Sequence, residues 1–208
     1  MLTKITSYFP SLTETQKQQF ETAIQTYIYW NDKINVVSRK DISNLEERHF
    51  LHALSIGKFV HFAHQTHIAD VGTGGGFPGI PLAILFPECS FTLIDSIEKK
   101  LLVASEVINS CHLKNVSVLR SRAESSKILV DFVTGRAVED LSVFVQRVRH
   151  MVRPGNRSSM PNGILYLKGG DSIMTKPIKG IVEEFPLSSV FSEDFFETKK
   201  LLHINPFS

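Results

Sequence analysis

The spacing of apolar and polar residues divides the chain into two parts. In residues 1–65, apolar side chains recur at the three- and four-residue intervals of amphipathic helices. Thr13-x-x-Gln16 has the form of a helix capping box and precedes the first such pattern. Ser43-x-x-Glu46 has the same form and precedes the second. We therefore predict an N-terminal helical extension over residues 1–65.

From residue 66 onward, short apolar runs alternate with helical patterns. Strands separated by helices favour right-handed crossovers and a parallel sheet covered on both faces. The last two runs have no helix between them and predict a C-terminal antiparallel hairpin. The sequence thus predicts an α/β fold with a doubly wound, mostly parallel sheet, as one unit over residues 66–208. The expected strands are 68–71, 91–95, 116–119, 130–134, 164–168, 185–191 and 198–204, and the expected helices are 79–86, 98–111, 140–152 and 171–183.

The first expected strand runs into a glycine-rich segment, DVGTGGGFPG over residues 70–79. Gly72 and Gly74 fit the start of a dinucleotide-binding fingerprint, but the third position is Phe77. Glycines here let the backbone approach a nucleotide-like ligand. Asp70 precedes them, and its charge would repel a diphosphate. We therefore favour S-adenosylmethionine, which carries a sulfonium, over NAD, and the alternative is an ordinary tight turn.

Polar residues follow the other expected strands as well. In a doubly wound sheet, ligands bind beyond the carboxyl ends of the strands. Asp95 ends the second strand. An acid that binds ribose hydroxyls is expected roughly 20 residues after the glycine-rich turn, and Asp95 fits that position. The alternative for Asp95 is a carboxylate that caps the next helix. The third, fourth and fifth strands are followed by residues 121–124, 135–137 and 168–170, which include glycine, acid or base.

Composition is that of a soluble globular domain. The 208 residues are 42% hydrophobic and 21% charged, and the formal net charge of +2 does not by itself indicate nucleic acid. Between residues 120 and 157, eight basic residues stand against four acids. This excess is compatible with a positive patch, but charge alone favours an ordinarily charged surface. No apolar run approaches the ~18–20 residues of a membrane span, and the first ten residues do not resemble a secretory signal.

Metal-binding and disulfide patterns are weak. Cys89 and Cys111 are isolated, and we expect free thiols in a reducing cytosol. His61, His64 and His67 recur at intervals of three, but we interpret them as surface histidines and expect no metal site.

Several motifs occur together in a characteristic order. They are Trp30-Asn31-x-Lys33-Ile34-Asn35, Arg48-His49, the segment 70–83, Arg122-Ala123-Glu124, Arg136-Ala137-Val138 and Leu167-Lys168-Gly169-Gly170. With them, roughly residues 28–170 resemble the bacterial 16S ribosomal RNA (guanine-N7) methyltransferase G family, also called glucose-inhibited division protein B. The resemblance implies a class I methyltransferase with a Rossmann-like fold. It also implies a cytoplasmic enzyme that uses S-adenosylmethionine to methylate N7 of a guanine in 16S rRNA of the small ribosomal subunit.

The resemblance also assigns roles by position. Gly72 and Phe77 would line the cofactor pocket, Ala123 and Glu124 the adenine edge, and Arg136 the mouth of the site. From the strand pattern we add Gly74 and Asp95 to the cofactor-binding residues. The catalytic candidates are Arg136, Lys168 and His49 on the substrate side. Guanine N7 has a free lone pair, so we expect orientation to carry the catalysis without an obligatory general base.

RNA would be held by phosphate contacts from basic residues, and the binding would depend on salt. The target guanine would leave its stack, with Phe77 or Trp30 stacking on it or on the cofactor. We expect a monomer with no membrane or DNA partner. The alternatives are a methyltransferase for a small molecule or protein, a nicotinamide oxidoreductase, and a non-catalytic ribosome-binding factor. Candidate phosphate contacts are Lys33, Arg39, Arg48, Lys99, Lys100, Arg122, Arg136, Arg147 and Lys168.

Overall fold

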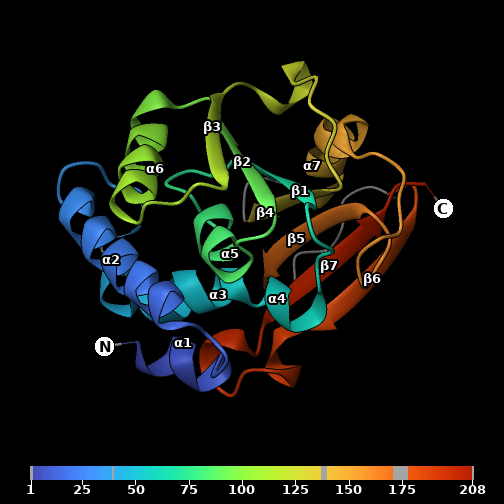
Figure 1. Cartoon of the computed structure of the whole chain (residues 1–208). Coiled ribbons are helices and arrows are strands. Elements are labelled where there is room, and N and C mark those ends of the chain that lie inside the picture. The colour runs from blue at the N-terminus through green and yellow to red at the C-terminus, as the bar shows by residue number, and fades with distance from the viewer. Residues whose placement is uncertain (1, 39, 137–139, 171–177, 208) are drawn as a thin grey trace.

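The computed structural model describes residues 2–38, 40–136, 140–170 and 178–207. These residues form one seven-stranded sheet in the order β3-β2-β1-β4-β5-β7-β6 (Figure 1). The first five strands are parallel, and β7 runs antiparallel to both β5 and β6. The expected doubly wound sheet with a C-terminal hairpin is therefore confirmed. The strands are β1 His67–Val71, β2 Ser90–Asp95, β3 Val116–Arg120, β4 Phe132–Arg136, β5 Gly163–Gly169, β6 Ile181–Pro186 and β7 Lys199–Asn205.

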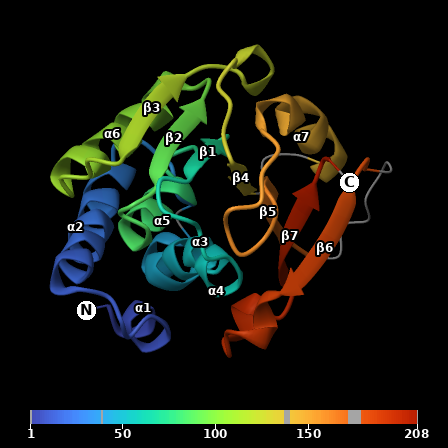
Figure 2. The same cartoon turned by 45° about the vertical axis from the view of Figure 1, so that its right-hand side comes forward.

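Helices cover both faces of the sheet (Figures 1 and 2). Side chains alternate between the two faces, so Ile68 and Leu165 belong to one hydrophobic core and Ala69 and Ile164 to the other. The N-terminal helices, α5 and α6 pack on the first face, and α7 packs on the second. The helices are α1 Thr3–Tyr8, α2 Glu14–Asn31, α3 His52–Leu54, α4 Ile56–Phe59, α5 Gly79–Leu85, α6 Glu98–Ser110 and α7 Leu141–Val148.

The capping box at the start of α2 is confirmed. The Thr13 hydroxyl accepts from the backbone N–H of Gln16, and the Gln16 side chain accepts from the backbone N–H of Thr13. The amide of Gln16 also donates to the carbonyl oxygen of Ile84 at 2.8 Å, at the end of α5. This local sequence signal therefore also fixes α2 against the end of α5.

The second expected capping box is wrong. Glu46 caps a different helix, because its Oε1 accepts from the backbone N–H groups of Lys4 and Ile5 at 2.8 and 2.9 Å, in the first turn of α1. The segment around it runs as a 3₁₀ turn, Ile42–Asn44, followed by a π-helical segment, Glu46–Leu51. The N-terminal helices thus share one hydrophobic core with the first face of the sheet.

The expected helix over residues 171–183 is wrong where the structure describes it. Residues 171–177 lie outside the described residues, and β6 already begins at Ile181. This strand lies at the edge of the sheet and is mostly exposed, so its sequence lacks the alternation that would have indicated it. The expected strand over 185–191 accordingly ends at Pro186, and a 3₁₀ turn, Leu187–Ser189, follows.

Among the described residues, no helix has the length and apolar character needed to cross a membrane.

Candidate functional site

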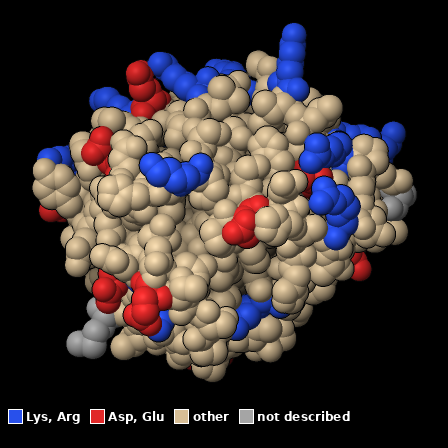
Figure 3. All heavy atoms as spheres, in the orientation of Figure 1, with Lys and Arg blue, Asp and Glu red and all other residues tan. Residues whose placement is uncertain are grey.

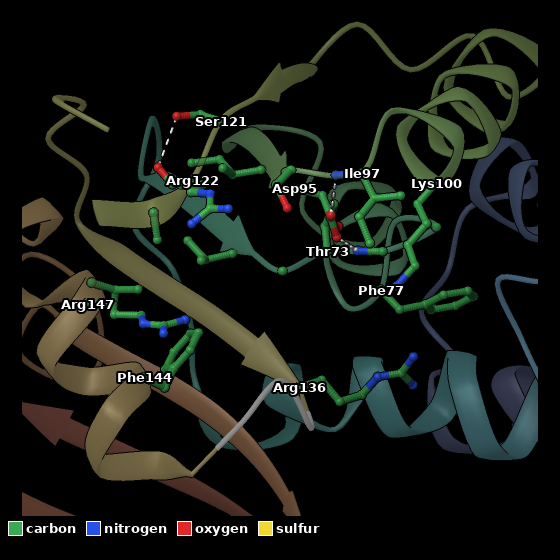
Figure 4. A pocket seen from close by; sticks show the side chains of 18 of the residues that line it. Thr73, Phe77, Asp95, Ile97, Lys100, Ser121, Arg122, Arg136, Phe144 and Arg147 are labelled. Atoms are coloured by element: carbon green, nitrogen blue, oxygen red, sulfur yellow. Dashed lines mark hydrogen bonds between the residues drawn. The ribbon is translucent and has the colours of Figure 1, made fainter. Parts of the chain in front are cut away.

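A cleft of about 460 Å³ opens where β1, β2, β3 and β4 end (Figure 4). It brings together all seven cofactor-binding residues expected from the sequence, which come from four separate strand ends. Figure 4 shows Arg122 and Arg147 on one wall and Lys100 and Phe77 on the opposite wall, with Asp95 between them. The expected residues that line the cleft are Gly72, Gly74, Phe77, Asp95, Ala123, Glu124 and Arg136.

The glycine-rich loop after β1 needs glycine for its backbone conformation. Gly72, Gly74 and Gly76 have φ angles of 69°, 57° and 111°, in a region that other residues adopt only with strain. At Gly76 a Cβ atom would also lie 2.4 Å from Cδ1 of Ile80. The loop is therefore a specific structure rather than a generic turn, and its backbone forms one wall of the cleft.

Tyr27 of helix α2 contacts this loop on its buried side. It was not among the site residues predicted from the sequence. Tyr27 is fully buried, and its hydroxyl donates to the carbonyl oxygen of Gly75 at 2.7 Å. Its ring stacks on Phe77 with 4.7 Å between the ring centroids. Phe77 lines the cleft, is 4% exposed, and has one partner for its ring already in Tyr27. Trp30, the other stacking candidate, does not line the cleft.

Asp95 lines the cleft, and its carboxylate accepts hydrogen bonds from two backbone N–H groups. One carboxylate oxygen accepts from the N–H of Gly74 at 2.9 Å, and the other accepts from the N–H of Ile97 at 2.9 Å, at the start of α6. Asp95 therefore ties the glycine loop to the start of the helix while lining the cleft. A carboxylate offers about four lone-pair positions, so two remain for ligand hydroxyl groups.

Asp70 does not line the cleft, so the argument from its charge does not involve direct contact with a ligand there. Its carboxylate is fully buried and accepts hydrogen bonds from the Thr73 hydroxyl, the Gly79 N–H and the Thr134 hydroxyl. Burial raises the pKa of Asp70 to about 6. This side chain organises the inside of the loop and the start of α5.

Arg136 and His49 meet at the end of β4. Nη2 of Arg136 lies 3.0 Å from Nδ1 of His49, and the guanidinium lies 5.0 Å from the centre of the Phe77 ring. A guanidinium only donates, so His49 accepts through Nδ1 and carries its proton on Nε2. Burial and the charge of Arg136 lower the pKa of His49 to about 3. His49 is therefore neutral at physiological pH and suited to hold Arg136 rather than to act as a base.

Burial also lowers the pKa of Arg136 to about 10, and the guanidinium remains protonated at neutral pH. Among the described residues, no carboxylate lies within 4.0 Å of it. Its partners are uncharged, since the other contact is a 3.5 Å hydrogen bond to the carbonyl oxygen of Arg48. The positive charge of Arg136 is thus held in place at the cleft without being neutralised by an ion pair.

Lys168 is not brought to the cleft with the other catalytic candidates. Arg136 pairs in register with Leu167, and side chains alternate along β5. Leu165 and Leu167 face the core under the N-terminal helices, so Lys168 lies on the other face of the sheet, toward α7. Arg136 lies with His49 on the first face. The two cations expected to act together are separated by the sheet.

Glu124 and several of the basic candidates lie at the cleft or its rim, and other basic side chains lie on the surface around it. Glu124 lies in the 3₁₀ segment Ala123–Ser125, and its carboxylate is 3.4 Å from Nε of Arg147, a half-exposed pair at the rim. Lys and Arg side chains gather along the upper and right-hand margins of the face in Figure 3, over β3 and α7. Arg39 lies outside the described residues. The basic candidates that line the cleft are Lys100, Arg122, Arg136 and Arg147.

The histidines and cysteines outside the cleft have ordinary surroundings. His64 lies 3.0 Å from a carboxylate oxygen of Glu88, and His67 lies 3.0 Å from the Thr92 hydroxyl. Cys89 and Cys111 are buried free thiols. Within the described ranges, no group of three or more histidine, cysteine or acidic side chains is arranged to hold a metal ion.

Comparison with a solved structure agrees with this architecture. A chain in the crystal structure of the fibrillarin/Nop5p complex superposes with a TM-score of 0.53 at 12% sequence identity, covering 74% of this chain and 79% of that chain. At this identity the likeness concerns the fold alone.

Comparison with known sequences identifies the family. Ribosomal RNA small subunit methyltransferase G of Bacteroides thetaiotaomicron is 51% identical over 200 residues, which cover 96% of this chain and 97% of that protein. The protein of the same name from Flavobacterium johnsoniae is 46% identical over 203 residues, covering 97% and 96%. The family described as rRNA small subunit methyltransferase G matches residues 16–172, a segment that contains the whole cleft. The chain belongs to the rRNA small subunit methyltransferase G family.

Proposed function

We propose that the chain transfers a methyl group from S-adenosylmethionine to N7 of a guanine in 16S rRNA. The observation that supports this most strongly is that residues from four strand ends converge on one cleft within the segment matched by the family. We further propose that it acts in the cytoplasm, as a monomer, on the small ribosomal subunit or its rRNA.

The cleft has features that fit the cofactor. The left-handed glycines bring backbone rather than side chains to one wall, and Asp95 presents unused lone pairs at the end of β2. Gly72, Gly74 and Asp95 would hold the cofactor, with Ala123 and Glu124 at the adenine edge. When bound, S-adenosylmethionine supplies an electrophilic methyl group on its sulfonium.

Arg136 would orient the guanine. Its fixed N–H donors suit a base oxygen such as guanine O6, which neighbours N7, and N7 itself must stay free to react. His49 is then a positioning residue, because it accepts a hydrogen bond from Arg136 and does not change its charge. The chain needs no group to remove a proton from N7, and a histidine with a pKa of about 3 could not serve as such a base at neutral pH.

The role proposed for Lys168 differs from that of Arg136. It lies at the end of β5 but on the face of α7, outside the cleft. We propose that Lys168 contributes to binding the RNA around the site, so its replacement would affect affinity for RNA more than the methyl-transfer step.

The test is methylation of 16S rRNA transcripts and of small ribosomal subunits with labelled cofactor, followed by nuclease digestion and mass spectrometry. We expect 7-methylguanosine from the wild type and from Arg120→Gln, and its loss with Arg136→Gln. Arg120 is a matched control, because it is an exposed strand-end arginine that pairs with Glu98 outside the cleft. Label on adenine, on a ribose hydroxyl, on protein or on a small molecule would refute the proposed reaction.

A further inference from the structure

Two cations beside the cleft share one aromatic ring. Phe195 belongs to the 3₁₀ segment Asp194–Phe196, just before β7. The guanidinium carbon of Arg48 lies 5.7 Å from the centre of its ring, and Nζ of Lys199 lies 4.8 Å from it. Both are within the ~6 Å at which an aromatic ring attracts a cation. Both positive charges therefore lie against the same ring.

These charges are only partly compensated. Nη1 of Arg48 pairs with Asp41 at 2.7 Å, but its Nε is buried without a hydrogen-bond partner. Nζ of Lys199 donates to the Thr198 hydroxyl at 3.0 Å and forms no ion pair with any residue that the structure describes. The carboxylate of Asp41 thus balances only one of the two positive charges. The remaining positive charge favours binding of an anion.

The group lies on the substrate side of the cleft. Alternation along β7 places Lys199 on the face of Leu201, which belongs to the core under the N-terminal helices. Arg136 lies on that same face, and its Nη1 is 3.5 Å from the carbonyl oxygen of Arg48. Arg48 and His49 are adjacent on the π-helical segment. Arg48 contacts the ring of Phe195 and His49 contacts Arg136, so this segment connects the two groups.

The buried side chain of His52 packs against the ring of Phe195. Its ring lies 5.6 Å from that of Phe195, and its Nε2 is buried without a hydrogen-bond partner. Burial and the charges of Arg136 and Lys199 lower the pKa of His52 well below its usual value. His52 therefore adds no positive charge of its own beside Arg136 and Lys199.

We propose that Arg48, Phe195 and Lys199 form a phosphate clamp for the rRNA strand that carries the target guanine. The inference rests on the proposed function, because it assigns the anion to a backbone phosphate next to the base at Arg136. A phosphodiester suits the site, since its two non-bridging oxygens accept from a guanidinium and an ammonium at once. Phe195 would keep the two cations in position before the RNA arrives.

The test measures binding of 16S rRNA and of small ribosomal subunits over a range of KCl concentrations for Lys199→Gln and Lys200→Gln. A phosphate contact contributes about 0.7–0.9 to the slope of log affinity against log salt. We expect Lys199→Gln to lower the slope by about this amount, with unchanged cofactor affinity and melting temperature. Lys200 is the matched control, because it follows on the same strand, points to the other face and pairs with Glu184 at 3.0 Å. Its replacement should leave the slope nearly unchanged.

A second variant tests the ring itself. Phe195→Leu keeps both charges and removes the aromatic face, so we expect weaker rRNA binding and a smaller effect of Lys199→Gln in the double variant. Wild-type slopes in Lys199→Gln would refute the clamp while leaving the proposed function intact. Lysine-dependent binding of inorganic phosphate with unaltered rRNA binding would also refute it, in favour of a free-anion site. Failure of the wild type to bind either RNA substrate would refute the proposed function itself.

Discussion

Tyr27→Phe is expected to weaken both the fold and cofactor binding through a single hydroxyl group. The substitution keeps the ring against Phe77 and Phe50 but leaves the buried carbonyl of Gly75 without the 2.7 Å hydrogen bond that it now accepts. An unsatisfied buried polar group costs about 1–3 kcal/mol, so the free energy of unfolding should fall by that amount. If the same energy also frees the loop, affinity for S-adenosylmethionine falls by about tenfold for each 1.4 kcal/mol.

Urea unfolding, followed by the fluorescence of Trp30 on the same helix, measures the first effect, and calorimetric titration with S-adenosylmethionine measures the second. Tyr29→Phe is the matched control, because Tyr29 lies on the same helix, is 58% exposed, and its hydroxyl accepts a hydrogen bond from the Lys33 side chain. We expect its unfolding free energy to change by less than about 0.5 kcal/mol. Equal stability and cofactor affinity in Tyr27→Phe and the wild type would refute the idea that α2 supports the loop.

Four further outcomes are expected. Arg136→Gln should lose methyl transfer while cofactor affinity, measured by calorimetry, stays within about twofold, roughly 0.4 kcal/mol. His49→Gln, which keeps an acceptor, should retain more single-turnover activity than His49→Phe, which keeps only the ring packing; equal rates would contradict the positioning role. Asp95→Ala should weaken cofactor binding, and an unchanged titration would remove Asp95 from the site. Because the pKa of Asp70 is raised to about 6, the native state binds its proton more tightly than the unfolded state. The free energy of unfolding should therefore fall as pH rises from about 4 to 6. Urea titrations of Asp70→Asn should lack this dependence of stability on pH.

The elements that the sequence predicted well depend on local signals. The capping box at Thr13 needs only residues one turn apart, and the structure contains it. The similar signal at Ser43 fails because Glu46 bonds to backbone groups of Lys4 and Ile5, which are distant in sequence. The two motifs therefore differ in that Gln16 bonds within its own helix turn, whereas Glu46 bonds to the start of another helix.

The candidate site shows the same division. Strand-end reasoning brought Asp95 and Arg136 to one cleft, because parallel strands end at the same edge of the sheet. It could not assign the face of Lys168, which depends on the register between β4 and β5. It also missed Tyr27, since a tyrosine in a helical apolar pattern is indistinguishable from a core residue until its hydroxyl partner is known.

The contact between Tyr27 and Gly75 links the cofactor to the first thirty residues of the chain. A ligand that binds only the native state stabilises every part that must be folded for binding, by about 2.7 kcal/mol at a hundredfold excess over its dissociation constant. Occupancy of the cleft should therefore slow amide hydrogen exchange in α2, on the far side of the loop from the ligand. A shortened chain that starts at residue 66 would keep every glycine of the loop and still lack the surface against which the loop is ordered.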